Sequence, residues 1–116
     1  MLQLPPPSRL CLATHPVDFR TGIDGLAAVC RQRLGENPLE GAVYVFRNRA
    51  GTALKLLLYD GQGYWMMMKR LSQGRFHWWP TTADARVPLS ARELSILLWH
   101  GDPERAQMAQ EGRRVA

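Results

Sequence analysis

The sequence predicts an α+β fold, in which an antiparallel β-meander of four or five strands carries two amphipathic helices packed on one of its faces. Three observations predict this fold. Apolar residues recur at helical spacing over residues 22–34, they recur with a period of two over residues 43–79, and the helical spacing returns over residues 91–99. Such a change of period and back is typical of helices that are segregated from an antiparallel sheet.

The first elements are a strand and a helix. "SRLCLAT", residues 8–14, is a short apolar run after a proline cluster, and it predicts a strand that enters the core. In "TGIDGLAAVCRQRLG" the pairing of Thr21 with Asp24 has the form of a capping box, and Gly35 marks the stop. One face of this predicted helix, over residues 22–34, carries the apolar positions Ile23, Leu26, Ala27, Cys30 and Leu34.

Four runs of strand-forming residues follow: "AVYVFRN", "TALKLLLYD", "GYWMMMKRL" and "RFHWW". The short connections "RAG", "GQG" and "SQG" can each close a hairpin, with Gly supplying a positive φ. If Gly74 closes a three-residue loop, Lys69 faces His77. One face of the last hairpin then carries Trp65, Met67, Lys69, Arg75, His77 and Trp79, and the other face carries Met66, Met68, Phe76 and Trp78. A slip of one residue in the loop would exchange the faces of the last strand.

The last predicted element is a helix over residues 91–99. In "LSARELSILLW", Ser90 and Glu93 form a capping box, and Leu89 and Leu94 form a hydrophobic staple. Leu94, Leu97 and Leu98 make the predicted buried stripe. We therefore expect a single α+β domain over residues 1–100 and a loosely ordered tail over residues 101–116. The residues expected to be buried are Leu26, Cys30, Leu56, Leu58, Leu94 and Leu98.

The composition limits the class of protein. With 116 residues, of which 46% are hydrophobic, the chain fits one domain with one core. Every apolar run is interrupted well before the roughly 18 residues that a membrane span needs. The amino end lacks the pattern of a secretory signal, which predicts a cytoplasmic protein. Cys11 and Cys30 are expected to be reduced core thiols, and we expect no metal and no cofactor.

The formal net charge of +5 is concentrated in one segment. Between Val43 and Pro80 there are six basic residues and one acid, Asp60, whereas the rest of the chain is balanced. Arginine, the predominant basic residue, suits bidentate phosphate contacts and stacking on aromatic rings. The candidate nucleic-acid-binding residues are Arg47, Arg49, Lys69, Arg70 and Arg75. The alternative is a solvated basic face without a ligand, with Trp65, Trp78 and Trp79 packed in the core.

The sequence shows no nucleophile with its base, no metal cluster and no paired carboxylate set, so we expect a protein that is not an enzyme. Asp18 and Asp24 could approach a divalent ion, but the loop between them lacks further oxygen ligands. The glycines of "YDGQGYW" do not begin a helix, so a hairpin turn explains them better than a phosphate-binding loop. His15, His77 and His100 have no spacing that suggests a triad or a ligand set.

The order of the motifs "VDFRTGIDGL", "VYVFRNRAG", "LKLLLYDGQGYWMMMKRLSQGRFHWW" and "LSARELSILL" resembles a known family. This family is the small accessory protein of bacterial insertion sequences of the IS66 group, called TnpB or the second open reading frame product. The likeness covers the chain from about Leu10 to Trp99. Thr21 stands where the family often has a basic residue, and "WHGD" replaces the usual apolar-acidic end of the last helix.

The resemblance implies a non-catalytic helper of transposition, whose partner is the transposase of the same element and which leaves the cutting and joining of DNA to that enzyme. Together with the basic meander, it suggests binding of the element's DNA or of the transposase–DNA complex. The alternative is a protein-only adaptor that docks the transposase without contacting DNA.

Overall fold

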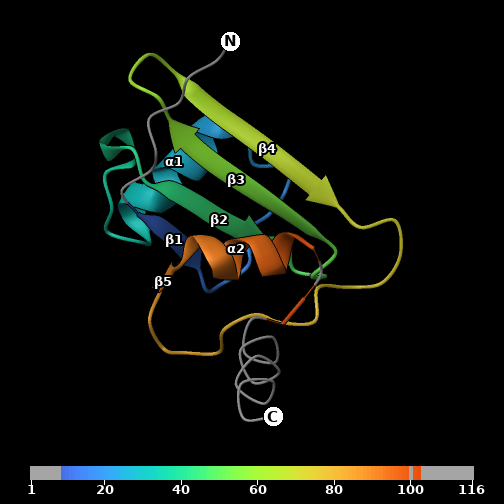
Figure 1. The fold of residues 1–116 in the computed structure, drawn as a ribbon. Coiled ribbons are helices and arrows are strands. Elements are labelled where there is room, and N and C mark those ends of the chain that lie inside the picture. The colour runs from blue at the N-terminus through green and yellow to red at the C-terminus, as the bar shows by residue number, and fades with distance from the viewer. Residues whose placement is uncertain (1–8, 100, 103–116) are drawn as a thin grey trace.

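The structure, a computed structural model, describes residues 9–99 and 101–102. Its centre is a five-stranded sheet in the order β4-β3-β2-β1-β5, with one helix on each face (Figure 1). The elements are β1 (Leu10–Ala13), α1 (Ile23–Gln32), the short 3-10 helix η1 (Pro38–Glu40), β2 (Val43–Arg47), β3 (Ala53–Tyr59), β4 (Tyr64–Arg70), β5 (Arg86–Leu89) and α2 (Ala91–Leu98). The α+β class and the two helices are confirmed.

The sheet is mixed, so the prediction of a purely antiparallel sheet is wrong. β1 pairs parallel with β2, while β2, β3 and β4 form the predicted antiparallel meander. The physical reason is the connection between β1 and β2, which contains α1 and η1 and is long enough to carry the chain back to the same end of the sheet. Gly51 and Gly61, in the two tight turns of the meander, have the positive φ that the sequence predicts.

The predicted strand over residues 75–79 is also wrong, because these residues form no strand. The chain leaves the sheet after Arg70 and returns to pair β5 with β1 on the far side. Trp79 is held there by its indole Nε1, which donates hydrogen bonds of 3.2 Å to the carbonyl oxygens of Ala13 and Thr14. Trp79 is partly buried against the α2 cluster, and burying a Trp is favourable when its N–H has a hydrogen-bond partner. The expected pairing of Lys69 with His77 therefore does not form.

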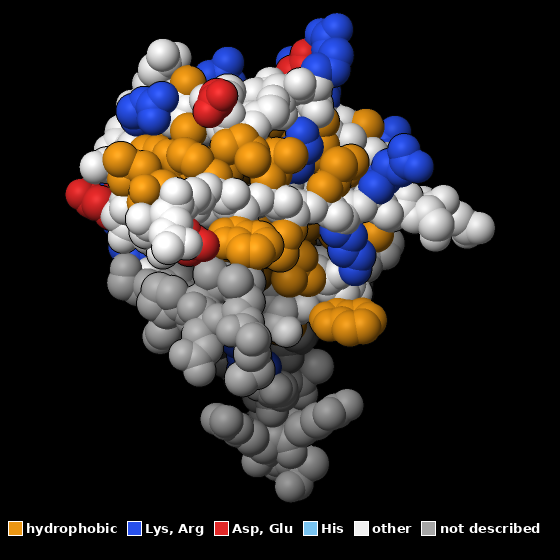
Figure 2. Space-filling model, turned by 90° about the horizontal axis from the view of Figure 1, so that it is seen from above, with side chains coloured by type: hydrophobic (Ala, Val, Ile, Leu, Met, Phe, Trp, Pro, Cys, Tyr) orange, Lys and Arg blue, Asp and Glu red, His pale blue; other side chains and the backbone are white. Residues whose placement is uncertain are grey.

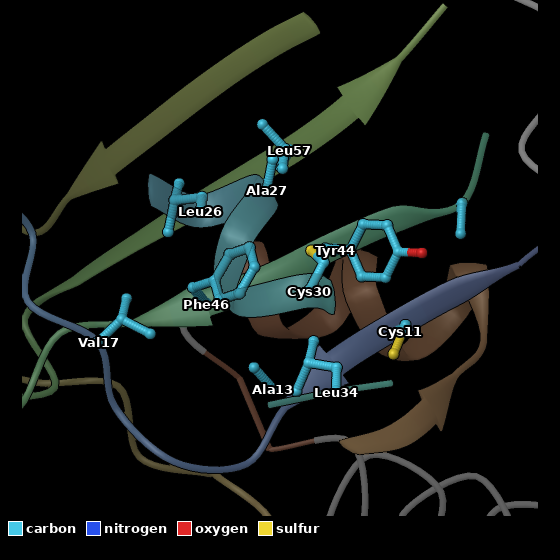
Figure 3. Close-up of a cluster of buried hydrophobic side chains, with 11 residues drawn as sticks. Cys11, Ala13, Val17, Leu26, Ala27, Cys30, Leu34, Tyr44, Phe46 and Leu57 are labelled. Carbon is cyan, nitrogen blue, oxygen red and sulfur yellow. The ribbon is translucent and has the colours of Figure 1, made fainter. Parts of the chain in front are cut away.

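The two helices cover opposite faces of the sheet, so the prediction that both pack on one face is wrong. Along β1, Cys11 and Ala13 join the cluster under α1, and Leu12 joins the cluster under α2. Figure 3 shows the α1 cluster, in which Tyr44, Phe46 and Leu57 of the sheet face the helix. The central strands β2 and β3 are therefore buried on both faces, and this leaves the outer strand β4 as the exposed one.

The predicted core is confirmed for Leu26, Cys30, Leu56 and Leu58, which are all buried. It is wrong for Leu94 and Leu98, which are half-buried, because Leu97 is the fully buried residue of α2. Burial raises the pKa of the Cys30 thiol to about 12 and also raises the pKa of the Cys11 thiol.

The two predicted helix starts have different outcomes. At α2 the capping box is confirmed, since Ser90 Oγ accepts from the Glu93 N–H at 3.0 Å and Glu93 Oε1 accepts from the Ser90 N–H at 2.9 Å. At α1 the N-cap is Gly22, with no side-chain cap, so the capping box of Thr21 and Asp24 is wrong. Thr21 instead crowds Gly25, where an added Cβ would collide with the Thr21 methyl group.

The predicted loose tail, residues 101–116, lies outside the described residues except for its first two. Over the described ranges, neither helix combines the length and the apolar character that crossing a bilayer requires.

Candidate nucleic-acid interface

The five predicted site residues come together at one end of the sheet. Arg47 ends β2 and Arg70 ends β4, while Arg49 lies in the turn between β2 and β3. The segment after β4 is attached to that turn, because the Leu71 N–H donates to Thr52 O at 2.9 Å and the Phe76 N–H donates to Gly51 O at 2.8 Å. We call this group the basic end; its residues are Arg47, Arg49, Lys69, Arg70 and Arg75.

The members of the basic end point to both faces of the sheet. Arg47 and Lys69 both pair with Leu54 in the strand ladders, so their side chains lie on the face that α2 covers. Arg70 pairs with Ala53 and lies on the α1 face. The basic end therefore wraps around the end of the sheet, and Arg49, Arg70 and Arg75 are its exposed members.

Arg47 is held in the structure rather than fully presented to solvent. Its guanidinium carbon lies 5.6 Å from the ring centre of Trp79, and the side chain is half-buried. Its Nε is buried without a hydrogen-bond partner among the described residues. Burial, with the nearby charge of Arg49, lowers the pKa of Arg47. Arg47 therefore has a structural role as well as a positive charge.

Lys69 also makes a structural contact. Its Nζ donates to the carbonyl oxygen of Leu98 at the end of α2 and lies 5.5 Å from the ring centre of Trp99. A cation at a helix C-terminus satisfies free carbonyl groups and interacts favourably with the helix dipole. Lys69 thus fixes the end of α2 against β4 and keeps Trp99 close to the basic end.

A cleft of about 770 Å³ lies beside Arg49 and includes Arg20 and Arg33, which are not among the predicted site residues. We call it the arginine cleft; it is lined by Pro16, Val17, Asp18, Phe19, Arg20, Arg33, Asn48, Arg49 and Ala50. The Val17 N–H donates to Arg47 O at 3.0 Å and so attaches the "VDFR" loop to the basic end. Arg20 and Arg33 were missed because they lie in segments whose charges balance along the sequence.

One acid offsets the positive charge of the arginine cleft. Asp18 accepts hydrogen bonds from Arg20 Nε, at 3.1 Å to each carboxylate oxygen, from Nη2 at 2.6 Å and from the Arg20 backbone N–H at 2.9 Å. This pairing with Arg20 lowers the pKa of Asp18 to about 2, so Asp18 is charged at neutral pH. Arg33 and Arg49 are exposed, and they leave the cleft with a net positive charge that suits an anionic ligand.

Lys55 positions the loop that carries Arg20. This lysine is only 5% exposed, and its Nζ donates to Phe19 O at 2.8 Å and to Thr21 O at 2.9 Å. It also lies 4.9 Å from the ring centre of Phe19. Lys55 is therefore a structural cation at the centre of the sheet, in agreement with its omission from the predicted site.

The other predicted features have simpler explanations. Trp78 and Trp79 pack against the α2 cluster, as the core interpretation expects, and Trp65 on β4 is exposed. Within the described residues, no three His, Cys, Asp or Glu side chains gather in a way that could hold a metal ion. His100 lies outside these residues.

Comparison with known proteins supplies the family. A model described as "IS66 Orf2 like protein" matches residues 8–108. The chain belongs to the IS66 Orf2-like family. This confirms the resemblance drawn from "VDFR", "VYVFRN" and the motifs that follow, and it indicates an accessory protein of IS66 transposition.

Two relatives come from Sinorhizobium fredii (strain NBRC 101917 / NGR234). "Uncharacterized protein y4hO" is 41% identical over 90 residues, which cover 78% of this chain and 77% of the relative. "Uncharacterized protein y4jC" is 36% identical over 90 residues, which cover 78% of this chain and 76% of the relative. No solved structure matches the chain.

Proposed function

We propose that this chain is a non-catalytic accessory protein of IS66 transposition that binds the element's DNA, or the transposase–DNA complex, through the basic end and the arginine cleft. Its partner is the transposase of the same element, which carries out the cutting and joining of DNA. We expect it to act in the cytoplasm. The observation that carries the proposal is the meeting of Arg20, Arg33 and Arg49 in one cleft beside the basic end.

The chemistry of these side chains favours phosphate as the ligand. Guanidinium groups present several N–H donors in a plane that matches two phosphate oxygens, and they stay charged at any physiological pH. Arg33, Arg49 and Arg70 are exposed on different segments of the chain, and each can contact a phosphate oxygen. Contacts of this kind fix the position of a protein on DNA without reading its sequence.

Arg47 and Lys69 have a second role in this proposal. Both are half-buried, and each lies against a tryptophan. They therefore stabilise the part of the fold that carries the exposed arginines. Arg47→Ala would therefore disturb packing as well as charge. Exposed arginines make cleaner test positions than this residue.

Fluorescence anisotropy with labelled duplex DNA from the element's end tests the proposal. We expect Arg33→Ala combined with Arg49→Ala to weaken binding by roughly tenfold or more at low salt. Arg92→Ala is the matched control, because Arg92 is an exposed arginine near the start of α2, away from the basic end. Arg92→Ala removes one charge and the double variant removes two, so a loss of binding free energy in Arg92→Ala that reaches half that of the double variant would point to bulk charge and contradict a defined site.

The alternative function is that of a protein-only adaptor that docks the transposase without contacting DNA. The observation that favours it is Trp99, a large hydrophobic side chain that is 83% exposed. A pull-down with purified transposase distinguishes the two functions. If the protein retains transposase at high salt, loses it in Trp99→Ala and shows no affinity for DNA, the adaptor function replaces the DNA-binding one.

A further inference from the structure

The strand β4 is a long and apolar edge of the sheet. It has seven residues, and among the residues that the structure describes no strand pairs with its outer side. Figure 2 looks down on this side of the molecule and shows hydrophobic side chains running across it as a band. The exposed fractions are 38% for Trp65, 36% for Met66, 50% for Met67 and 53% for Met68.

Neither a bulge nor a proline interrupts β4, and its two charged residues, Lys69 and Arg70, stand at its end. Its register with β3 continues without a bulge from Tyr64 to Arg70, and the strand contains no proline. The opposite edge differs, because β5 has four residues and includes Pro88, which removes a backbone donor. An exposed edge of this length with an apolar middle is a template for pairing with another strand.

The hydrogen bonds next to β4 determine which of its backbone groups face outward. The Asp60 N–H donates to Gly63 O at 3.0 Å, and the Leu71 N–H donates to Thr52 O at 2.9 Å. In an antiparallel ladder, hydrogen-bonded pairs alternate with non-hydrogen-bonded ones, so the odd-numbered residues of β4 direct their backbone groups toward β3. The residues that direct an N–H and a C=O to the open side are Tyr64, Met66, Met68 and Arg70.

We propose that β4 pairs antiparallel with β4 of a second copy of this chain, around a two-fold axis through Met67. The two five-stranded sheets then become one continuous sheet. The pairs across the axis are Tyr64 with Arg70, Trp65 with Lys69, Met66 with Met68, and Met67 with Met67 of the second copy. Every outward-facing backbone group of β4 gains a partner in this arrangement.

The side chains of β4 are complementary to themselves when the strand is reversed. Three methionines occupy the middle, where their flexible side chains can adjust to one another. The first two residues are aromatic and the last two are cationic, so reversal places Lys69 opposite Trp65, and Arg70 opposite Tyr64. The aromatic end also carries a carboxylate, because Asp60 accepts from Trp65 Nε1 at 2.8 Å. Opposite charges therefore meet at both ends.

This complementarity selects both the partner and the register. A shift of the axis to Met66 or Met68 keeps the alternation of the hydrogen bonds but leaves residues at one end unpaired and removes the cations from the aromatic rings. The proposal does not depend on DNA binding. If both proposals hold, the dimer carries two basic ends at opposite ends of the paired strands.

Disulfide trapping of the full-length protein tests the axis directly. In a non-hydrogen-bonded pair the two Cα atoms lie about 4.5 Å apart, within reach of a disulfide bond. We expect Met67→Cys to form a covalent dimer under mild oxidation, while the native Cys11 and Cys30 are buried and react slowly. Met68→Cys is the matched control, because its two copies lie about 7 to 8 Å apart on a diagonal. Equal or faster trapping of Met68→Cys would overturn the proposed axis.

Sedimentation velocity over a range of concentrations tests the dimer without new cysteines. We expect the wild-type protein to dimerise. The dimer of Met66→Pro should be weaker by roughly tenfold or more, since the proline removes an outward N–H from each copy. The ladder with β3 should survive, because the Met66 N–H does not point toward β3. A circular dichroism melt checks the fold of the variant.

A charge variant gives an independent result. Met67→Lys brings two like charges together at the axis and should weaken the dimer, whereas Leu39→Lys adds the same charge at an exposed position on η1 and should not.

A wild-type protein that stays monomeric at all concentrations overturns the proposal. If the monomeric wild type binds the transposase and Met66→Pro does not, the β4 edge is a binding site for the transposase and not for a second copy.

Discussion

At the scale of single residues, the structure separates cations that hold the fold from cations that are presented to solvent. Lys55 is buried and bonds to two carbonyl oxygens, Arg47 and Lys69 lie against tryptophans, and Arg49 is exposed in a turn. Sequence alone could count these charges but could not separate them, because the separation depends on which strand is central. The structural cations determine the position of the exposed ones.

Replacing Lys55 tests this role. Lys55→Met keeps most of the apolar stem but leaves the carbonyl groups of Phe19 and Thr21 without their donor. We expect the free energy of unfolding to fall by roughly 1 to 3 kcal/mol, measured by urea denaturation. Arg31→Met, at an exposed position on α1, should leave the urea midpoint nearly unchanged. Equal midpoints for the Lys55→Met variant and the wild type would show that Lys55 contributes nothing to the fold.

The pairing of Asp18 with Arg20 predicts a pH dependence. Because the pKa of Asp18 is lowered to about 2 in the folded chain, the pairing stabilises the fold above the unfolded pKa of about 4. This stabilisation is lost as the pH falls from about 4 to about 2. We expect the thermal midpoint of wild type to exceed that of Asp18→Asn at pH 7 and the difference to shrink at pH 2 to 3. A difference that is independent of pH would contradict the pairing.

The buried thiols predict slow chemistry. Burial raises the pKa of Cys30 to about 12, so its reactive thiolate form is scarce in the folded state at neutral pH. We expect a thiol reagent to label Cys30 slowly in buffer and rapidly in denaturant. Labelling followed by mass spectrometry measures both rates, and fast labelling of the folded protein would count against the burial of α1 on the sheet.

At the scale of elements, local signals were predictable and long-range ones were not. The capping box of Ser90 and Glu93 involves residues three apart, so the start of α2 follows from sequence. The parallel pairing of β1 with β2 depends on where α1 returns the chain, which no local pattern determines. The run ending in Trp79 alternates like a strand, yet Trp79 is held by carbonyl oxygens of residues 13 and 14, far away in sequence.

The orientation of α2 gives a prediction for this element. Leu97 is fully buried, whereas its neighbour Leu98 is half-buried, although both belong to the predicted stripe. We expect Leu97→Ala to cost roughly 2 to 5 kcal/mol of unfolding free energy and Leu98→Ala to cost clearly less. Chemical denaturation measures the unfolding free energy of each variant. A larger loss in Leu98→Ala than in Leu97→Ala would contradict the orientation of α2, which turns Leu97 toward the sheet.

At the scale of the whole molecule, the topology explains how a chain with a modest net charge obtains a basic surface. The β2–β3 turn, the end of β4 and the "VDFR" loop meet at one end of the sheet, and the arginines that they carry come from distant parts of the sequence. The sequence predicted the basic residues of this surface that lie between Val43 and Pro80. It missed Arg20 and Arg33, because the loop and helix that carry them reach the site only through the crossover from β1 to β2.

The salt dependence of DNA binding tests the central claim, that this end of the molecule contacts nucleic-acid phosphates. We predict that the logarithm of the binding constant falls linearly with the logarithm of salt concentration, and that Arg49→Ala and Arg70→Ala each reduce the magnitude of the slope by about 0.9. Arg92→Ala should keep the wild-type slope. Binding whose affinity does not change with salt, or a slope that is the same in all three variants and the wild type, would contradict the claim.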